Sequence, residues 1–181
     1  GKIYARNATG TLVCVDVAQK KTIAPAVMEA KSADQPSWPR WKGPRQDNIS
    51  TETGLLKQWP EQGPAMLWQY AGLGEGFASV SIADGRIYTV GMIQKEGFLY
   101  CLDMDGKLLW KSSYGPEWTK ATPGVRGTPT VDSGKVYVIS GIGRVTCFDA
   151  ADGKQLWQKD SFKEFEGKYH IWGIAESAVI D

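Results

Sequence analysis

Residues 134–157, with the sequence GKVYVISGIGRVTCFDAADGKQLW, carry the pattern that decides the fold. A Gly-Lys pair precedes a short apolar run with a tyrosine, a cysteine then stands two residues before an aspartate, and a second Gly-Lys pair leads to Leu-Trp. The same order recurs at residues 85–110, where Gly-Arg stands in place of the first Gly-Lys pair, and residues 1–16 begin a third copy whose Leu-Trp pair stands at residues 67–68. The last two copies are offset by 46 residues at their cysteines and by 47 at their tryptophans. A repeat of this length indicates an architecture of equivalent units.

Each copy is expected to form a four-stranded antiparallel sheet. Residues 136–139 and 145–148 are runs of β-branched and aromatic residues on either side of a turn, which is typical of a hairpin. The middle copy has three more residues between its tyrosine and its cysteine, so we expect a longer hairpin tip near residues 94–96. A further strand is expected ahead of each hairpin, at residues 78–82, 128–131 and 177–180.

Four-stranded units at this period are typical of propeller blades. Sustained helical periodicity is missing, and one short helix is expected at residues 161–167, where Ser161 and Glu164 have capping-box spacing. The sequence therefore predicts an all-β fold: a β-propeller of four-stranded antiparallel blades. About three blades are expected in this chain, as a partial ring or as one completed by oligomerisation.

The first unit is divided along the chain. Residues 1–17 are expected to supply strands of a split blade, residues 18–64 to form a long connection, and residues 65–181 to hold the propeller blades. Residues 65–70 and 175–181 are expected to complete the split blade, because the end of the chain joined to its start would reproduce a turn of the middle unit.

The charge balance argues against several classes of partner. The chain has 181 residues, with 21 Lys and Arg against 20 Asp and Glu, so its net charge is +1. This balance gives no reason to expect a nucleic acid or an acidic membrane as partner. An apolar run long enough to span a bilayer is missing, and we expect any signal peptide to lie outside this sequence.

The three cysteines, Cys14, Cys101 and Cys147, occupy the same position of the repeat. Equivalent positions lie in different units, usually too far apart for a disulfide. Small buried apolar side chains are therefore the favoured interpretation over a redox or metal role.

The repeats resemble the pyrroloquinoline-quinone-type propeller family, also called quinoprotein-alcohol-dehydrogenase-like. The residues that carry this resemblance are the Asp, Gly and Trp of its tryptophan-docking motif, here Asp149, Gly153 and Trp157, and Asp103, Gly106 and Trp110. In addition, residues 38–44 (WPRWKGP) look like the mature N-terminus of secreted bacterial members, which implies a periplasmic or extracellular location. One branch of the family holds quinone-dependent dehydrogenases and another holds non-catalytic scaffolds.

The enzyme interpretation finds little support in the residues. The resemblance would imply adjacent cysteines beside the quinone and acidic calcium ligands, but adjacent cysteines are missing. Asp16, Asp103 and Asp149 are better explained as turn residues. His170 is the only histidine. We therefore expect no catalytic residues, no metal site and no cofactor; pyrroloquinoline quinone with calcium belongs to the alternative, a fragment of a quinone-dependent dehydrogenase.

Position in the fold indicates one candidate site. The loops that enter the inner strands of a propeller form one rim of its channel, where ligands commonly bind. Residues expected there are Glu75, Arg126, Trp172 and Glu176. Arg126 and Glu176 are favoured as an ion pair that seals the channel. The functional alternative is a small polar ligand, with Arg126 as donor and Trp172 as stacking face.

Three blades cannot close a ring, since propellers use about four to eight. The expected partners are therefore further blades or a second copy of the chain, and beyond these a protein partner or a small ligand. The function expected is a non-catalytic binding or scaffolding module of an exported bacterial protein.

Overall fold

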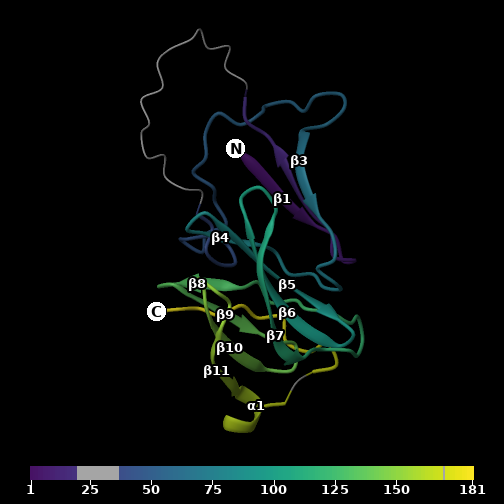
Figure 1. The fold of residues 1–181 in the computed structure, drawn as a ribbon, viewed down its shortest axis with the longest axis vertical. Helices are drawn as coiled ribbons and strands as arrows, with labels where there is room; N and C mark the ends of the chain where they lie inside the picture. Colours follow the sequence, from purple (N-terminus) through teal and green to yellow (C-terminus); the bar gives the residue numbers. More distant parts are fainter. Residues whose placement is uncertain (20–36, 169) are drawn as a thin grey trace.

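The computed structural model describes residues 1–19, 37–168 and 170–181. These residues form three antiparallel sheets that follow one another as blades of a β-propeller arc (Figure 1). Residues 20–36 of the expected connection, and Tyr169, lie outside the described residues. None of the described helices is long and apolar enough to cross a bilayer.

Blade 1 differs from the expected four strands, because its sheet has three among the described residues. Its order is β1-β2-β3, with antiparallel pairing throughout. The sheet is formed by β1 (Lys2–Arg6), β2 (Leu12–Asp16) and β3 (Ala65–Tyr70). Residues 175–181 do not join it; they lie beside blade 3, at the other end of the arc. The division of the chain at residues 17/18 and 64/65 stays a prediction.

Blade 2 is a four-stranded sheet in chain order. Its strands are β4 (Ser81–Ala83), β5 (Arg86–Ile93), β6 (Glu96–Asp103) and β7 (Leu108–Pro116). The extra residues of this unit lengthen β5 and β6 and leave a turn of two residues, Gln94 and Lys95, both with positive φ. Two positive φ values suit the right-handed twist of a hairpin, so the expected long tip is instead a longer ladder.

Blade 3 repeats the same order and adds a single helical turn. Its elements are β8 (Thr130–Asp132), β9 (Lys135–Ile139), β10 (Arg144–Asp149), β11 (Gln155–Asp160) and α1 (Ser161–Glu164). The N-cap of α1 is Asp160, whose carboxylate accepts from the Lys163 N–H at 3.2 Å. The expected cap, Ser161, donates its hydroxyl to the Gly143 carbonyl instead.

A row of Tyr, Cys and Trp crosses each sheet. In blade 2, Tyr88 is opposite Cys101, and Cys101 is opposite Trp110. The rings of Tyr88 and Trp110 have centroids 6.0 Å apart, and the equivalent pairs of the other blades are 6.0 and 6.1 Å apart. All three cysteines are buried and unpaired, as expected from their position in the repeat.

The tryptophan of one blade packs over a glycine turn of the next. A Cβ added to Gly153 in blade 3 would lie 2.4 Å from Cε3 of Trp110, and one added to Gly106 would lie 2.5 Å from Cε3 of Trp68. Gly153 also has φ +75°, where other residues are strained. The turn aspartates support these glycines: Asp149 Oδ1 accepts from the Ala151 N–H at 2.7 Å.

Replacing Gly153 by alanine is expected to destabilise the protein by about 2–5 kcal/mol, because a left-handed residue costs about 1–2 kcal/mol and overpacking adds about 1–3. Gly134 is the matched control, with φ +71° and nothing within 4 Å of an added Cβ. Gly134→Ala should cost about 1–2 kcal/mol, from the backbone alone. Urea denaturation followed by circular dichroism measures both, and equal losses would show that the Trp110 ring does not confine Gly153.

Residues 38–40 tie the inner strands together. The backbones of Trp38 and Ile82 exchange two hydrogen bonds of 2.8 and 2.9 Å, and the Val131 N–H donates to the Pro39 carbonyl at 2.7 Å. The Arg40 guanidinium lies 3.6 Å from the carboxylate of Asp132. This segment therefore fastens β4 of blade 2 to β8 of blade 3.

Candidate functional site at the rim of the arc

The loops that lead into the inner strands lie side by side at one rim of the arc. Gly76, ahead of β4, forms a parallel bridge with Val125, ahead of β8, and the Phe77 N–H donates to the Val125 carbonyl at 2.6 Å. The Ile174 N–H donates to the Gly141 carbonyl of the β9–β10 turn at 2.9 Å. Backbone hydrogen bonds thus hold the three entry loops in fixed relation.

The Arg126 side chain forms its hydrogen bonds within its own loop. Its guanidinium donates to the carbonyls of Gly124 and Ala121, at 3.4 and 3.2 Å, and to the carbonyl of Thr122. The expected ion pair with Glu176 is not formed: the salt bridges among the described residues do not include either side chain. Arg126 therefore shapes residues 121–126 and does not seal the channel.

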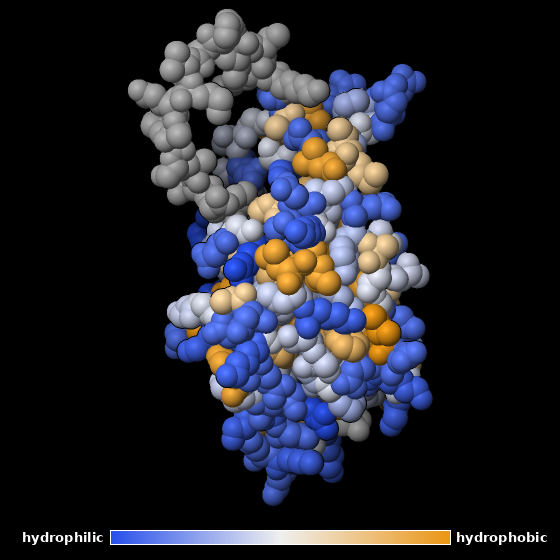
Figure 2. Space-filling model, in the orientation of Figure 1, coloured by the Kyte–Doolittle hydropathy of each residue, from blue (hydrophilic) through white to orange (hydrophobic). Residues whose placement is uncertain are grey.

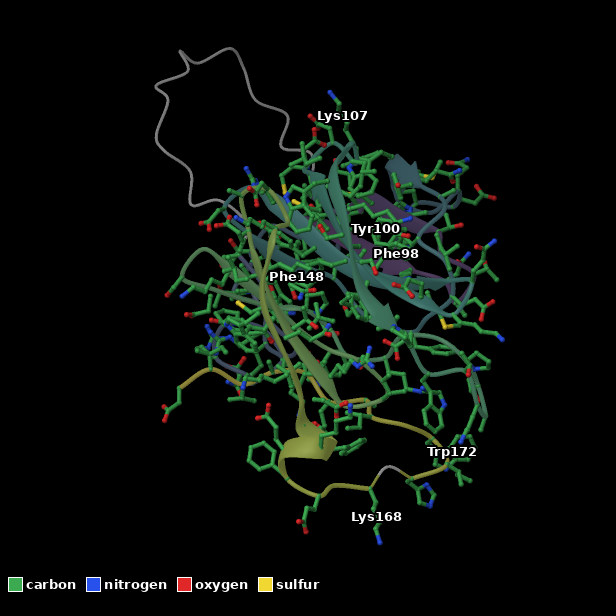
Figure 3. All side chains as sticks on the ribbon, turned by 60° about the horizontal axis from the view of Figure 1, so that its bottom comes forward. Phe98, Tyr100, Lys107, Phe148, Lys168 and Trp172 are labelled. Atoms are coloured by element: carbon green, nitrogen blue, oxygen red, sulfur yellow. The ribbon has the colours of Figure 1, made fainter. Side chains whose placement is uncertain are left out.

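The other three expected residues are exposed at the same rim. Glu75 exchanges backbone hydrogen bonds of 2.8 Å with Met92, which fixes its main chain on blade 2. Trp172 is 54% exposed and lies on the loop between α1 and the C-terminal residues (Figure 3). The backbone carbonyl of Glu176 lies so close to Gly127 that a Cβ there would be 2.5 Å from it. The rim brings these residues to one side without joining their side chains.

A shallow cavity of about 230 Å³ opens beside them. It is lined by Trp118, Lys120, Ala121, His170 and Ile171. The Ala121 carbonyl in its wall is one of the groups that Arg126 holds, and Ile171 directly precedes Trp172. Lys120 and His170 are exposed, and Lys120 gives the cavity a cationic edge. Neither residue was singled out from the sequence as part of a site. The sequence signal that could have indicated this cavity is the offset between equivalent positions of the repeat. Ala121 and His170 are 49 residues apart, and so are Ser79 and Thr128.

A buried carboxylate, Glu117, organises the inner wall of the rim. The side chain is 4% exposed, and its Oε1 accepts from the N–H groups of Trp118 and Gly141 at 2.7 and 2.5 Å. The hydroxyl of Tyr114 donates to Oε2 at 3.1 Å. Burial raises the pKa of the Glu117 carboxyl above its usual value, although these donors and Arg126 oppose the shift. Sequence reasoning missed this residue, since nothing in the repeat marks it.

A half-buried arginine joins blade 1 to the rim. The Arg6 guanidinium donates to the carbonyls of Val90 and Gly74 at 2.5 and 3.0 Å. Burial lowers the pKa of Arg6 to about 10, so the side chain remains charged at neutral pH. Its two bonds cross from β1 to blade 2, which makes Arg6 a structural residue of the rim.

The cysteines and acidic side chains of the described residues give little support for redox or metal chemistry. Burial raises the pKa of the thiols of Cys14 and Cys147, and raises that of Cys101 to about 11, which keeps all three in the unreactive thiol form. Asp16 and Asp103 accept hydrogen bonds from backbone N–H groups two residues ahead, as Asp149 does, which confirms their role in turns. No three His, Cys, Asp or Glu side chains of the described ranges are grouped to hold a metal ion.

A larger cavity, of about 900 Å³, lies away from this rim. One wall is the free edge of β1 at Lys2, Ile3 and Tyr4. The facing wall includes Val80 and Ile82 at β4. None of the residues expected to bind a ligand lines it. The cavity follows the side of blade 1 on which the other blades carry an inner strand.

The sequence of this chain matches a known protein family and a characterised enzyme. The family model described as outer membrane protein assembly factor BamB matches residues 52–165. The quinohemoprotein alcohol dehydrogenase ADH-IIG of Pseudomonas putida is 33% identical over 130 residues, which are 65% of this chain and 17% of that enzyme. The chain thus spans about a sixth of the length of this curated relative.

Two solved structures align with the chain. BamB from Moraxella catarrhalis aligns with a TM-score of 0.50 and 15% identity, over 87% of this chain and 33% of that one. The quinohemoprotein alcohol dehydrogenase of Comamonas testosteroni aligns with a TM-score of 0.49 and 18% identity, over 88% and 19% of the two chains. At such identities the match to BamB shows the propeller fold alone.

Proposed function

Because the chain belongs to the PQQ-type propeller repeat family described by the BamB model, we propose that it is a non-catalytic binding or scaffolding module of an exported protein. An extracytoplasmic location fits the name of that family, an outer membrane assembly factor. The partners that suit such a module are further propeller blades, a second copy of the chain or another protein.

One observation carries this proposal: the flank of blade 3 is bare. Trp157 of β11 is 42% exposed. The equivalent tryptophans, Trp68 and Trp110, pack over the glycine turns of the next blade. Apolar patches also interrupt the polar surface elsewhere (Figure 2). An aromatic side chain left open at the position that is packed in the other blades is typical of an interaction surface.

A second candidate is favoured by one finding, the 33% identity to the Pseudomonas putida enzyme. Under that alternative the chain would be part of a quinone-dependent dehydrogenase. The described residues fit the quinone and calcium poorly, because the cysteines lie in three different sheets and acidic side chains form no metal-binding group. Titration with pyrroloquinoline quinone and calcium separates the two candidates: bound-quinone absorbance would favour the dehydrogenase.

We also propose a small polar ligand for the rim cavity, of anionic character. Lys120 supplies positive charge at its edge, and the His170 imidazole offers a polar group there. Trp172, next to the lining residue Ile171, has an exposed aromatic face, and Arg126 holds the wall at Ala121. Glu75 and Glu176 lie on the same rim but outside the cavity lining, so they are assigned to its surroundings. A carboxylate is the simplest ligand that this edge would attract.

Succinate is a suitable probe for the rim, followed by tryptophan fluorescence and by calorimetry. We expect saturable binding that weakens about tenfold or more in Lys120→Ala, because a hydrogen bond to a charged group contributes about 1.5–3 kcal/mol. Arg126→Ala and Trp172→Ala should weaken it as well. Lys168→Ala is the matched control, because this exposed lysine stands two residues before His170 but lies outside the cavity lining (Figure 3). Failure of the unaltered protein to bind would remove the ligand site and leave the scaffolding role.

A further inference from the structure

The rim cavity is small and mostly apolar. Its volume of about 230 Å³ lies below the range of about 300–1,000 Å³ that is typical of pockets enclosing a drug-sized ligand. Three of its five lining residues have apolar side chains, namely Trp118, Ala121 and Ile171. Trp118 is 2% exposed and forms the floor, whereas Ala121 and Ile171 are exposed. A space of this size and lining fits one large apolar side chain.

Backbone hydrogen bonds hold both walls of the cavity in place. The Gly124 N–H donates to the Trp118 carbonyl at 3.1 Å, and the Gly173 N–H donates to the His170 carbonyl at 3.0 Å. The indole Nε1 of Trp118 donates to the Ala121 carbonyl at 3.4 Å. Gly173 also packs on the indole, since a Cβ added there would lie 2.7 Å from Cδ2 of Trp118. The cavity is therefore preformed, and a ligand does not have to order it.

Positive charge at the cavity is not balanced by a carboxylate in its lining. None of the five described residues that line it is acidic, whereas Lys120 carries an ammonium group. The salt bridges among the described residues do not include Lys120. Arg126 adds a second positive charge at the Ala121 wall. Glu117, which precedes Trp118, is buried, and three donors occupy its oxygens. The edge of the cavity therefore complements a carboxylate on the ligand.

The cavity is too shallow to enclose a free ligand that carries both groups. Small-molecule pockets commonly bury about 70–90% of their ligand. Here the surface around the opening stays open, because Ile171 is 61% exposed and Trp172 is 54% exposed. A protein partner can cover such a surface with its own residues, while one anchor side chain fills the pocket at the centre.

We propose that the rim cavity receives a large apolar side chain from an acidic segment of a partner protein. The side chain lies over Trp118, and a neighbouring carboxylate of the same segment binds the Lys120 ammonium group. The inference rests on the proposed binding function and names the partner of its rim site. The free carboxylate proposed for that site corresponds to the acidic group of the segment.

Calorimetry on the full chain with short synthetic peptides tests this partner. The probe is acetyl-Asp-Asp-Phe-Asp-Asp-amide, and two matched peptides replace either Phe by Ala or every Asp by Asn. We expect the probe to bind more tightly than succinate. Loss of the phenyl ring should weaken binding by about tenfold or more, because a buried aromatic ring contributes that much. The Asn peptide should bind more weakly than the probe at low salt and should lose less affinity when salt is added.

Ala121→Leu tests the cavity itself, because it fills the space from an exposed wall. The fold should be retained, since Arg126 and Trp118 bind the carbonyl of residue 121 and not its side chain. We expect this variant to bind the probe about tenfold more weakly and no better than the Ala peptide, while succinate binding is unchanged. Ala151→Leu is the matched control, an exposed alanine in the turn that follows β10, and it should leave all affinities unchanged.

Lys120→Ala tests the charged contact. It should weaken binding of the probe and leave the affinity of the Asn peptide unchanged, because only the probe offers carboxylates. Equal affinities of the probe and the Ala peptide, or a probe that binds Ala121→Leu as well as the unaltered protein, would overturn the proposed partner. Succinate binding without peptide binding would also overturn it but would leave the rim ligand in place. Binding of neither would remove both.

Discussion

Replacing Trp110 by alanine should destabilise the protein by about 3–5 kcal/mol, one of the two largest effects expected for one side chain in this chain. The indole fills the space between blades 2 and 3, over Gly153 and beside Tyr88. Its removal leaves a cavity at that junction, and a cavity that cannot collapse adds to the lost burial. Urea denaturation followed by circular dichroism gives the change in the free energy of unfolding.

Leu109→Ala is the matched control for this prediction. Leu109 precedes Trp110 on β7 and points to the opposite face, where it is exposed. An exposed side chain away from special features changes stability by about 0.5 kcal/mol or less. Similar losses in the two variants would mean that the junction between the blades does not carry the stability of the fold.

The second large effect is expected at Glu117. Alanine there should cost about 3 kcal/mol or more, because three donors lose their acceptor in a buried site and each unsatisfied group costs about 1–3 kcal/mol. The donors are the N–H groups of Trp118 and Gly141 and the hydroxyl of Tyr114. Glu117→Gln retains an oxygen for the two N–H groups, so a small loss is expected for this variant.

The same residue should make stability depend on pH. The pKa of Glu117 is raised in the folded state above its usual 4.5 by burial. The protonated form is therefore favoured by folding, and its contribution is complete below pH 4.5 and lost as the pH rises through the folded-state pKa. The unaltered protein should lose stability relative to Glu117→Gln over that rise. A difference between the two that does not change with pH, measured by urea denaturation in a pH series, would contradict the shift.

The repeat in the sequence was enough to predict blades, hairpins and the Asx turns, since each depends on local pattern. Strand alternation and the Asp-Gly turns act within a few residues. The inner strands were less well predicted: β4 and β8 are three residues each, and residues 177–180 form no strand. A strand needs a partner, and none of the described strands pairs with residues 177–180.

The candidate site shows the same limit. Position in the repeat was enough to place Glu75, Arg126, Trp172 and Glu176 on one rim, but not to give their partners. Arg126 turns back to its own loop because three carbonyls of residues 121–124 converge on it. The hydrogen bonds of Glu117 likewise depend on a turn 24 residues away, at Gly141. Contacts between loops of different blades carry no signature in a single sequence.

Each blade holds one buried cysteine, so the labelling rate of each cysteine reports how often its own blade opens. A thiol enclosed in a sheet reacts with an alkylating agent only after that sheet opens, so the labelling rates of Cys14, Cys101 and Cys147 time the opening of blades 1, 2 and 3 individually. Peptide mapping would then resolve whether the arc comes apart from its ends or as one body, without introducing any foreign probe.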